Sequence, residues 1–275
     1  LQKELIFMPS FRLVTWNINS IRIRLDLLQR LTDIYAPDII CLQEVKAKSE
    51  DFPFEAIKSF GLEHIALYSM PSYNGVAILS KIPLADITPL DWVGKHDARH
   101  IKATIFGDIE INSLYIPAGG DIPDPIINLS FAHKLCFMDD ISEYFEQHED
   151  ALSKKKMLIC GDFNVAPSPN DVWNHKQLLK IISHTPIETG RLDRLFNSLD
   201  FTDAVRQIYP EPEKIFSWWS YRNPSWMINN KGRRLDHIWV TEPLKKSVFD
   251  VQFLKEFRSA ERPSDHIPVL IDLKI

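Results

Sequence analysis

The stretch that decides the fold is Met157-Leu158-Ile159-Cys160-Gly161-Asp162-Phe163-Asn164. Its first four residues are typical of a short buried strand, which delivers Asp162 and Asn164 at its carboxyl end. Because side chains alternate along an extended chain, these two polar groups are predicted to point to the same side. A carboxylate beside a carboxamide is what a hydrolytic site needs to hold and orient a water molecule. A strand followed by an Asx turn would have the same sequence, so the interpretation depends on the rest of the chain.

The same pattern, with polar residues at the edge of an apolar run, recurs at three other places. Asn17 follows one run, Glu44 follows a second, and Asp265-His266 directly precede a third. A bare carboxylate at the end of such a run is costly to bury, so Glu44 is expected either to pair with Lys46 or to bind a metal ion. The recurrence predicts one polar site assembled at the ends of several strands.

A further carboxylate completes the candidate site. Asp236 lies within Arg233-Arg234-Leu235-Asp236-His237 and is predicted to orient His266. Taken singly, each Asp or His is more often a helix cap or a surface group. Separate caps do not explain the whole set of Asn17, Glu44, Asp162, Asn164, Asp236, Asp265 and His266.

Length and composition bound the class of protein. The chain has 275 residues, of which 45% are hydrophobic and 25% charged, which is ordinary for a soluble globular protein. Its net charge of -5 excludes a polycation, so a nucleic-acid partner would need a local basic face. The odd number of cysteines, Cys41, Cys136 and Cys160, indicates reduced thiols. No apolar run approaches the roughly 20 residues of a membrane span, and we expect a cytoplasmic protein.

The chain reads as strands alternating with helices. A strand at 11–18, a helix capped by Ser20 and ended by Pro37, and a strand at 38–45 form an opening β-α-β unit. Short strands are predicted at 65–69, 75–80, 101–106, 110–116, 235–240 and 267–273, with an amphipathic helix at 131–147. No linker divides the chain, so residues 9–275 are predicted to be one domain of two packed sheets with helices outside. Residues 1–8 are interpreted as an N-terminal extension or an expression remnant.

Eight short motifs, in this order, give the chain a specific likeness. They are TWNIN (15–19), LQEVK (42–46), YNGVA (73–77), LYIP (114–117), GDFNVAP (161–167), FSWWSYR (216–222), RLDH (234–237) and PSDH (263–266). With them the chain resembles the exonuclease III family of apurinic/apyrimidinic endonucleases, in the endonuclease/exonuclease/phosphatase superfamily. The resemblance implies a four-layer α/β sandwich of the DNase I type, in which helices flank two packed mixed β-sheets. It also implies a monomer that acts on double-stranded DNA at abasic sites or 3′ ends. The reaction would be Mg²⁺-dependent hydrolysis (Mn²⁺ as a substitute) of the phosphodiester 5′ to an abasic site, with 3′-to-5′ exonuclease and 3′-phosphatase activities besides.

The resemblance also implies roles for individual residues. Glu44 matches the principal metal carboxylate, with Asn19 as an outer ligand, and the full metal set is Asn17, Glu44, Asp162, Asn164, Asp265 and His266. Asp162 matches the residue that activates the attacking water, and the catalytic set is Tyr115, Asp162, Asn164, Asp236 and His266. The substrate-binding set is Asn74, Arg99, Trp218 and Arg222.

Two positions depart from the family pattern. Ala118-Gly119-Gly120 stand where many relatives have Asn or Gln, which removes one polar contact near the phosphate. Arg233 stands where some relatives have a bulky apolar residue at the wall of the abasic-sugar pocket, and it is expected to change the pocket's shape. Of the neighbouring aromatics, Trp218 is predicted to be the pocket wall and Trp219 a core residue.

Basic residues near the motifs are expected to form a phosphate-tracking rim, while the run Lys154–Lys156 is expected at the opposite pole. The rim candidates are Arg22, Arg24, Lys46, Lys48, Arg99, Arg222, Lys231, Arg233 and Arg262.

Two other functions fit the pattern less well. A phosphoinositide phosphatase or another phosphodiesterase of the same fold would share the Glu, the Asp-x-Asn and the terminal Asp-His, but LQEVK and FSW favour the DNA-repair branch. A DNA-binding module without catalysis should lack at least one metal or water-activating position, and here every one is occupied.

Overall fold

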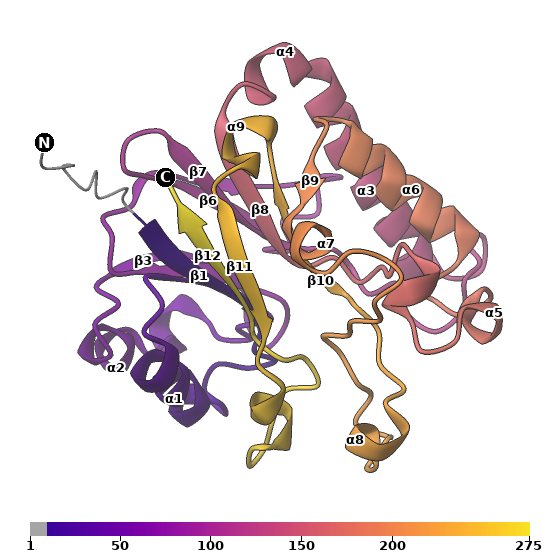
Figure 1. Cartoon of the computed structure of the whole chain (residues 1–275), viewed down its shortest axis with the longest axis horizontal. Coiled ribbons are helices and arrows are strands. Elements are labelled where there is room, and N and C mark those ends of the chain that lie inside the picture. The colour runs from indigo at the N-terminus through magenta and orange to yellow at the C-terminus, as the bar shows by residue number, and fades with distance from the viewer. Residues whose placement is uncertain (1–9) are drawn as a thin grey trace, which may run out of the picture.

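Two six-stranded sheets, with helices on their outer faces, make up the computed structural model, which describes residues 10–275 (Figure 1). The strands are β1 (Ser10–Asn17), β2 (Ile39–Gln43), β3 (His64–Tyr68), β4 (Val76–Ser80), β5 (Ala85–Leu90), β6 (His100–Ile105), β7 (Ile109–Tyr115), β8 (Lys156–Asp162), β9 (Thr202–Asp203), β10 (Asp236–Val240), β11 (Val248–Phe253) and β12 (Val269–Lys274). The α-helices are α1 (Leu25–Tyr35), α2 (Phe54–Ser59), α3 (Leu129–Gln147), α4 (Glu149–Leu152), α5 (His175–Leu178), α6 (Pro186–Asn197), α7 (Ala204–Ile208), α8 (Trp226–Asn229) and α9 (Glu242–Lys245). The interpretation of residues 1–8 lies outside the described residues.

The layers follow from which face of each strand is apolar. One sheet has the order β11-β12-β1-β2-β4-β3 and the other β5-β6-β7-β8-β10-β9. Their inner faces share a buried cluster that includes Leu13, Cys41, Ile111 and Cys160. The outer face of the first sheet packs against α1 and α2, and that of the second against α3 and α6. This is the predicted four-layer α/β sandwich.

Strand register brings the polar strand ends together. The pairs β1–β2 and β7–β8 are parallel, so their carboxyl ends lie at the same edge, with Asn17 opposite Gln43 and Tyr115 opposite Asp162. Strand β10 runs antiparallel to β8 and places Asp236 opposite Asp162. One edge of the sandwich therefore collects the candidate residues from both sheets.

The predicted start of the first helix is wrong by one turn or more. Helix α1 begins at Leu25 with Arg24 as its N-cap, and Ser20 caps no helix. Ser20 has a φ of 84°, and its N–H donates to the carbonyl of Glu44, which ties the segment after β1 to the end of β2.

In residues 10–275 no helix has both the length and the apolar character needed to cross a membrane.

Two buried histidines of the second sheet are held neutral. His100 accepts a hydrogen bond at Nδ1 from Trp92 Nε1 (3.2 Å), so its proton lies on Nε2, which faces Asn112 Oδ1 at 3.0 Å. His237 Nε2 donates to the carbonyl of Val165 over 2.8 Å. Burial lowers the pKa of each imidazole to about 4.

We therefore expect the free energy of unfolding to carry a histidine contribution that falls with acidification. Each imidazole titrates near 6.5 when unfolded and near 4 when folded, so the contribution is complete above about pH 6.5 and is lost as the pH falls toward 4. One pKa unit corresponds to about 1.4 kcal/mol, so each histidine contributes on the order of 3 kcal/mol. Urea unfolding between these pH values should show a shallower loss in His100→Gln and His237→Gln than in the parent, whereas exposed His96→Gln should follow the parent. If the unfolding free energy fell equally steeply with pH in all variants and the parent, the contribution assigned to His100 and His237 would be contradicted.

Candidate active site

A cavity of about 480 Å³ opens at the edge where the strand ends converge. It is lined by seven of the sequence-predicted residues, namely Glu44, Asp162, Asn164, Trp218, Arg222, Asp265 and His266, together with Arg233 and residues 181–183. Asn74 and Arg99 are not among its lining residues. The convergence predicted from the polar strand ends is therefore present.

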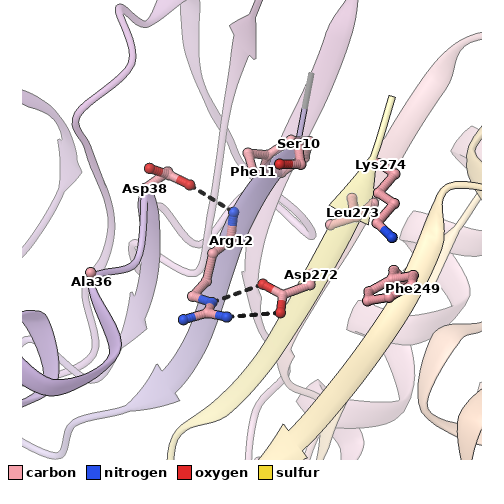
Figure 2. A pocket seen from close by; sticks show the side chains of 9 residues that line it. All are labelled: Ser10, Phe11, Arg12, Ala36, Asp38, Phe249, Asp272, Leu273 and Lys274. Carbon is pink, nitrogen blue, oxygen red and sulfur yellow. Dashed lines mark hydrogen bonds and ion pairs between the residues drawn. The ribbon is translucent and has the colours of Figure 1, made fainter. Parts of the chain in front are cut away.

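A smaller pocket of about 320 Å³ lies at the other end of β1 (Figure 2). Its central charge, Arg12, is engaged by both oxygens of Asp272 (2.8 and 2.9 Å) and by the carbonyl of Tyr35 (2.7 Å). The Asp38 carboxylate accepts the N–H of Arg12. Because these charges satisfy one another, the pocket is a structural ion-pair site and the cavity at the strand ends is the better candidate.

Asp162 and Asn164 form a tight loop directly after β8. The N–H of Asn164 donates to Asp162 Oδ1 (2.9 Å), and Asn164 Nδ2 donates to Asp162 Oδ2 (3.1 Å) and to the carbonyl of Ile116 (2.9 Å). Gly161 allows β7 to lie close to the end of β8, because a Cβ there would lie 1.8 Å from the carbonyl oxygen of Leu114. The carboxylate and the carboxamide are thus neighbours, but through an Asx turn and the left-handed backbone of Asn164 (φ 53°), because β8 ends at Asp162 and the predicted strand alternation does not continue to Asn164.

His266 lies between two carboxylates. Its Nδ1 is 2.8 Å from Asp236 Oδ2, and its Nε2 is 3.5 Å from Asp162 Oδ2. Burial alone would lower the pKa of His266, but the charges of Asp236 and Asp162 raise it to about 10, so the ring is an imidazolium at neutral pH. Burial raises the pKa of Asp162 to about 7, although the positive charge of His266 lowers it. Ligand atoms of these three residues lie within 4.8 Å of one another, a grouping that could also hold a cation.

Glu44 is surrounded by hydrogen-bond donors. Asn17 Nδ2 donates to Glu44 Oε1 (2.9 Å) and to Asp162 Oδ2 (2.8 Å), and the Tyr115 hydroxyl donates to Glu44 Oε1 (2.8 Å). Lys46 Nζ lies 2.6 Å from Glu44 Oε2. Burial works against ionisation, yet Lys46 and Asn17 hold the pKa of Glu44 below its usual range. Burial and the charge of Glu44 raise the pKa of Tyr115 well above 10, so its phenol stays protonated.

Asp265 supplies a second carboxylate at the cavity. Trp218 Nε1 donates to its Oδ2 (2.9 Å), and Asn19 Nδ2 donates to its Oδ1 (3.2 Å). Burial opposes ionisation, but the charge of His266 and the bond from Trp218 keep its pKa below the usual value. A carboxylate offers about four lone pairs, and Glu44 and Asp265 each accept fewer hydrogen bonds than that from the side chains named above. Two ionised oxygen ligands with spare lone pairs fit a hard divalent cation.

The remaining substrate-binding candidates divide into two groups. Trp218 is half-buried, lines the cavity and has the guanidinium of Arg233 over its ring at 5.2 Å, whereas Trp219 is fully buried and packs on Trp226 at 5.0 Å. Arg99 is buried, pairs with Asp97 and lies over the ring of Tyr115 at 4.7 Å.

Asn74 is also buried and donates to the carbonyl of Asp97 (2.8 Å). Asn74 lines neither this cavity nor the adjoining one of about 460 Å³, whereas Arg99 lines the adjoining cavity together with Tyr115 and Ala118.

The predicted basic rim is only partly exposed. Arg24 is buried and donates to Tyr221 Oη and to the carbonyl of Pro263, both over 2.9 Å, so it holds the loop before Asp265. Exposed positions are Arg22, Lys48, Arg222, Lys231 and Arg262. Lys156 begins β8, at the end remote from Asp162, and pairs with Asp108.

Sequence reasoning missed two serines that hold the catalytic candidates. Ser217 Oγ accepts the N–H groups of Leu235 and Asp236, both over 3.0 Å. Ser264 Oγ donates to the carbonyl of Asn17 (2.7 Å) and accepts the N–H of His266 (3.2 Å). Both serines lie inside the quoted motifs FSWWSYR and PSDH, which was the available signal.

Comparisons with known proteins agree with this geometry. The model of the Endonuclease/Exonuclease/phosphatase family matches residues 14–266. The exodeoxyribonuclease III of Haemophilus influenzae is 31% identical over 274 residues, covering 96% of this chain and all of that protein. An AP endonuclease from Archaeoglobus fulgidus superposes with a TM-score of 0.88 at 28% identity, and a Neisseria 3′ phosphatase bound to a product DNA hairpin with 0.87 at 29% identity. Each alignment covers 96% of this chain and all of the other. With this match along nearly its whole length, and with the polar strand ends gathered as described, the chain belongs to the endonuclease/exonuclease/phosphatase family.

Proposed function

We propose that the protein is a DNA repair nuclease that hydrolyses the phosphodiester 5′ to abasic sites in duplex DNA. The observation that carries the proposal is the gathering of Asp162, His266, Glu44 and Asp265 in one cavity that has Trp218 in its wall. The names of the relatives support it, since they include an exodeoxyribonuclease III and an AP endonuclease. A neighbour described as a 3′ phosphatase bound to DNA supports activity at 3′ ends as well, by exonuclease and phosphatase reactions. In this proposal the enzyme is a cytoplasmic monomer.

Mg²⁺ is the proposed cation, with Mn²⁺ as its substitute. Glu44 and Asp265 would hold it, because both carboxylates are ionised, face the cavity and have oxygen lone pairs to spare. Asn17, Asp162 and Asn164 complete the proposed metal surroundings, with Asn17 bridging Glu44 and Asp162 through its amide. His266, which the resemblance also assigns to the metal, is an imidazolium without a free lone pair, so its role here is toward the phosphate. When bound, the cation would neutralise charge on the phosphate and polarise the bond to phosphorus.

The chain's own groups account for the proton and charge movements. A pKa near 7 suits Asp162 to accept a proton from the attacking water, and Asn164 at 3.1 Å fixes the orientation of its carboxylate. The imidazolium of His266, held by Asp236, stabilises negative charge on a non-bridging phosphate oxygen. Tyr115 keeps its single phenolic proton, and the hydroxyl would have to turn away from Glu44 Oε1 to donate it to a phosphate oxygen.

Selection of damaged DNA is assigned to the wall that Trp218 forms. An abasic sugar lacks the base that would collide with this wall, so it can enter a cavity that a normal nucleotide cannot fill correctly. Arg233 is part of the same wall of the cavity. Its Nη1 donates to the carbonyl of Ile182 (2.9 Å) and to Ser183 Oγ (2.6 Å), which holds the guanidinium at the cavity. Arg222, exposed at the cavity rim, is placed to contact a phosphate.

The two neighbouring tryptophans should respond oppositely to truncation. Trp218→Ala is expected to lower abasic-site cleavage far more than thermal stability, because the residue is a half-buried wall. Trp219→Ala is expected to cost about 3–5 kcal/mol of unfolding free energy, because it empties a filled site. Thermal unfolding and specific activity of both variants check this, and a Trp218→Ala protein that unfolds while its folded fraction keeps full activity would reject the wall assignment.

One assay tests the proposed function directly. Labelled duplexes with an abasic analogue, a blunt 3′ end or a 3′-phosphate are incubated with Mg²⁺ or with a chelator, alongside soluble inositol phosphates. Mg²⁺-dependent cleavage 5′ to the abasic analogue supports the proposal. Turnover of inositol phosphates without cleavage of DNA would instead assign the chain to the phosphatase branch of the fold.

A further inference from the structure

A buried ion pair lies directly behind the cavity. Lys134 on α3 and Glu188 on α6 are both fully buried, and Lys134 Nζ is 2.5 Å from Glu188 Oε1. Burying two charges costs about as much as their attraction returns, so such a pair contributes little net stability compared with apolar side chains of the same size. The packing of α3 against α6 therefore does not explain why a charged pair is buried at this place. The pair's other hydrogen bonds do, because, apart from those of Thr185, which form the capping box of α6, they go to loops that surround the cavity.

Lys134 holds the loop that follows β8. Its Nζ donates to the carbonyl of Asn164 (2.8 Å) and to that of Ala118 (3.3 Å). Asn164 has a left-handed backbone with a φ of 53°, a conformation that asparagine adopts only at some cost. The N–H of the same residue donates to Asp162 Oδ1, so the anchored carbonyl holds the residue whose N–H sets the position of the Asp162 carboxylate. Ala118 lines the cavity on the adjacent loop.

Glu188 holds the opposite wall. Its carboxylate accepts the N–H of Ser183 (2.9 Å to each oxygen) and both the N–H (3.1 Å) and the hydroxyl (2.6 Å) of Thr185. Ser183, which also has a left-handed backbone (φ 82°), lines the cavity and accepts the bond from Arg233. The pair thus connects three segments of the cavity wall: the Asn164 loop, the Ala118 loop and the segment that ends at Ser183.

We propose that Lys134 and Glu188 are positioning residues that hold the Asn164 loop, and with it Asp162, against the two walls of the cavity. The inference rests on the proposed function of the cavity. Apolar side chains would fill the same space, but they would leave the carbonyls of Asn164 and Ala118 without donors, and the loop would then relax. A displacement on the order of 1 Å at a reacting group lowers turnover by about 10²-fold, so the effect should appear in kcat.

The test compares two double variants that carry no unpaired charge. Lys134→Met/Glu188→Gln keeps an acceptor for Ser183 and Thr185 but removes the donor to Asn164. Lys134→Gln/Glu188→Gln keeps an amide donor at position 134. On an abasic duplex the Met variant should lose about 10- to 100-fold in kcat with little change in KM, and the Gln variant should lose clearly less.

A half-buried pair elsewhere supplies the control. Lys102 and Glu110 bond at 2.9 Å across β6 and β7 and do not line the cavity. Lys102→Met should therefore lower the melting temperature and leave kcat unchanged.

Three results would each overturn the positioning role: equal kcat losses in the Met and Gln variants, parent-like kcat in the folded Met variant, or a loss confined to KM. If the Met variant does not fold, Lys134→Leu/Glu188→Gln, which also lacks the donor to Asn164, replaces it: a kcat loss larger than that of the Gln variant supports the role, and parent-like kcat overturns it. Failure of the parent protein to cleave any DNA substrate would instead reject the proposed function.

Discussion

Replacing Asp162 with asparagine is expected to lower turnover by roughly 10²–10⁴-fold, the range for loss of a positioned general base. Asparagine has the same shape and keeps one oxygen, which can accept from Asn17 or from the N–H of Asn164 but not from both, and it cannot accept a proton from water. Substrate binding should be retained or tightened, because one negative charge beside the phosphate is removed. Single-turnover rates and the dissociation constant for an abasic duplex separate the two effects. Asp150→Asn, on the exposed surface of α4, is the matched control and should behave like the parent.

A double-mutant cycle tests whether Asp236 acts through His266. If Asp236 acts by holding the imidazolium through the 2.8 Å bond, Asp236→Ala should cost little in a His266→Ala background. The double-mutant cycle on kcat therefore should show losses that are far from additive. Fully additive losses would mean that Asp236 acts on the reaction independently of His266.

The site was predictable where a residue's chemistry conflicts with its local sequence. Asp162, Glu44 and Asp265 end or precede apolar runs, where an ionised side chain needs a reason to be buried, and all three line one cavity. The pairing of Asp236 with His266 was also anticipated, and both fall within the predicted geometry. What the sequence lacks is the strand register, which alone places Asp236 opposite Asp162.

Other features left no local signal. Lys134 lies between Phe131 and Leu135 in an amphipathic helix, where a lysine is normally on the solvent face, so its burial depends on Glu188 more than fifty residues later. Strand β5 was missed because it is an exposed edge strand that contains Pro89, which propensity rules place outside strands. Asn74 falls in the motif YNGVA and Arg99 lies outside the quoted motifs, and tertiary packing directs both toward Asp97.

Removal of divalent cations is expected to abolish cleavage, and Glu44→Gln is expected to raise the Mg²⁺ concentration needed by at least about 100-fold. The magnitude follows from the 10- to 100-fold loss of affinity seen when only an outer partner of a metal ligand is changed. Glutamine retains an oxygen that accepts from Asn17 and Tyr115, so the melting temperature should stay close to that of the parent. Because glutamine lacks the negative charge, it should bind Mn²⁺ more weakly, and calorimetry can measure this without turnover. Glu63→Gln, at an exposed position, serves as the control. Undiminished cleavage in the presence of a chelator would reject the metal requirement. Normal Mn²⁺ binding by Glu44→Gln would show instead that the cation is held elsewhere, with the Asp162, Asp236 and His266 grouping as the next site to test.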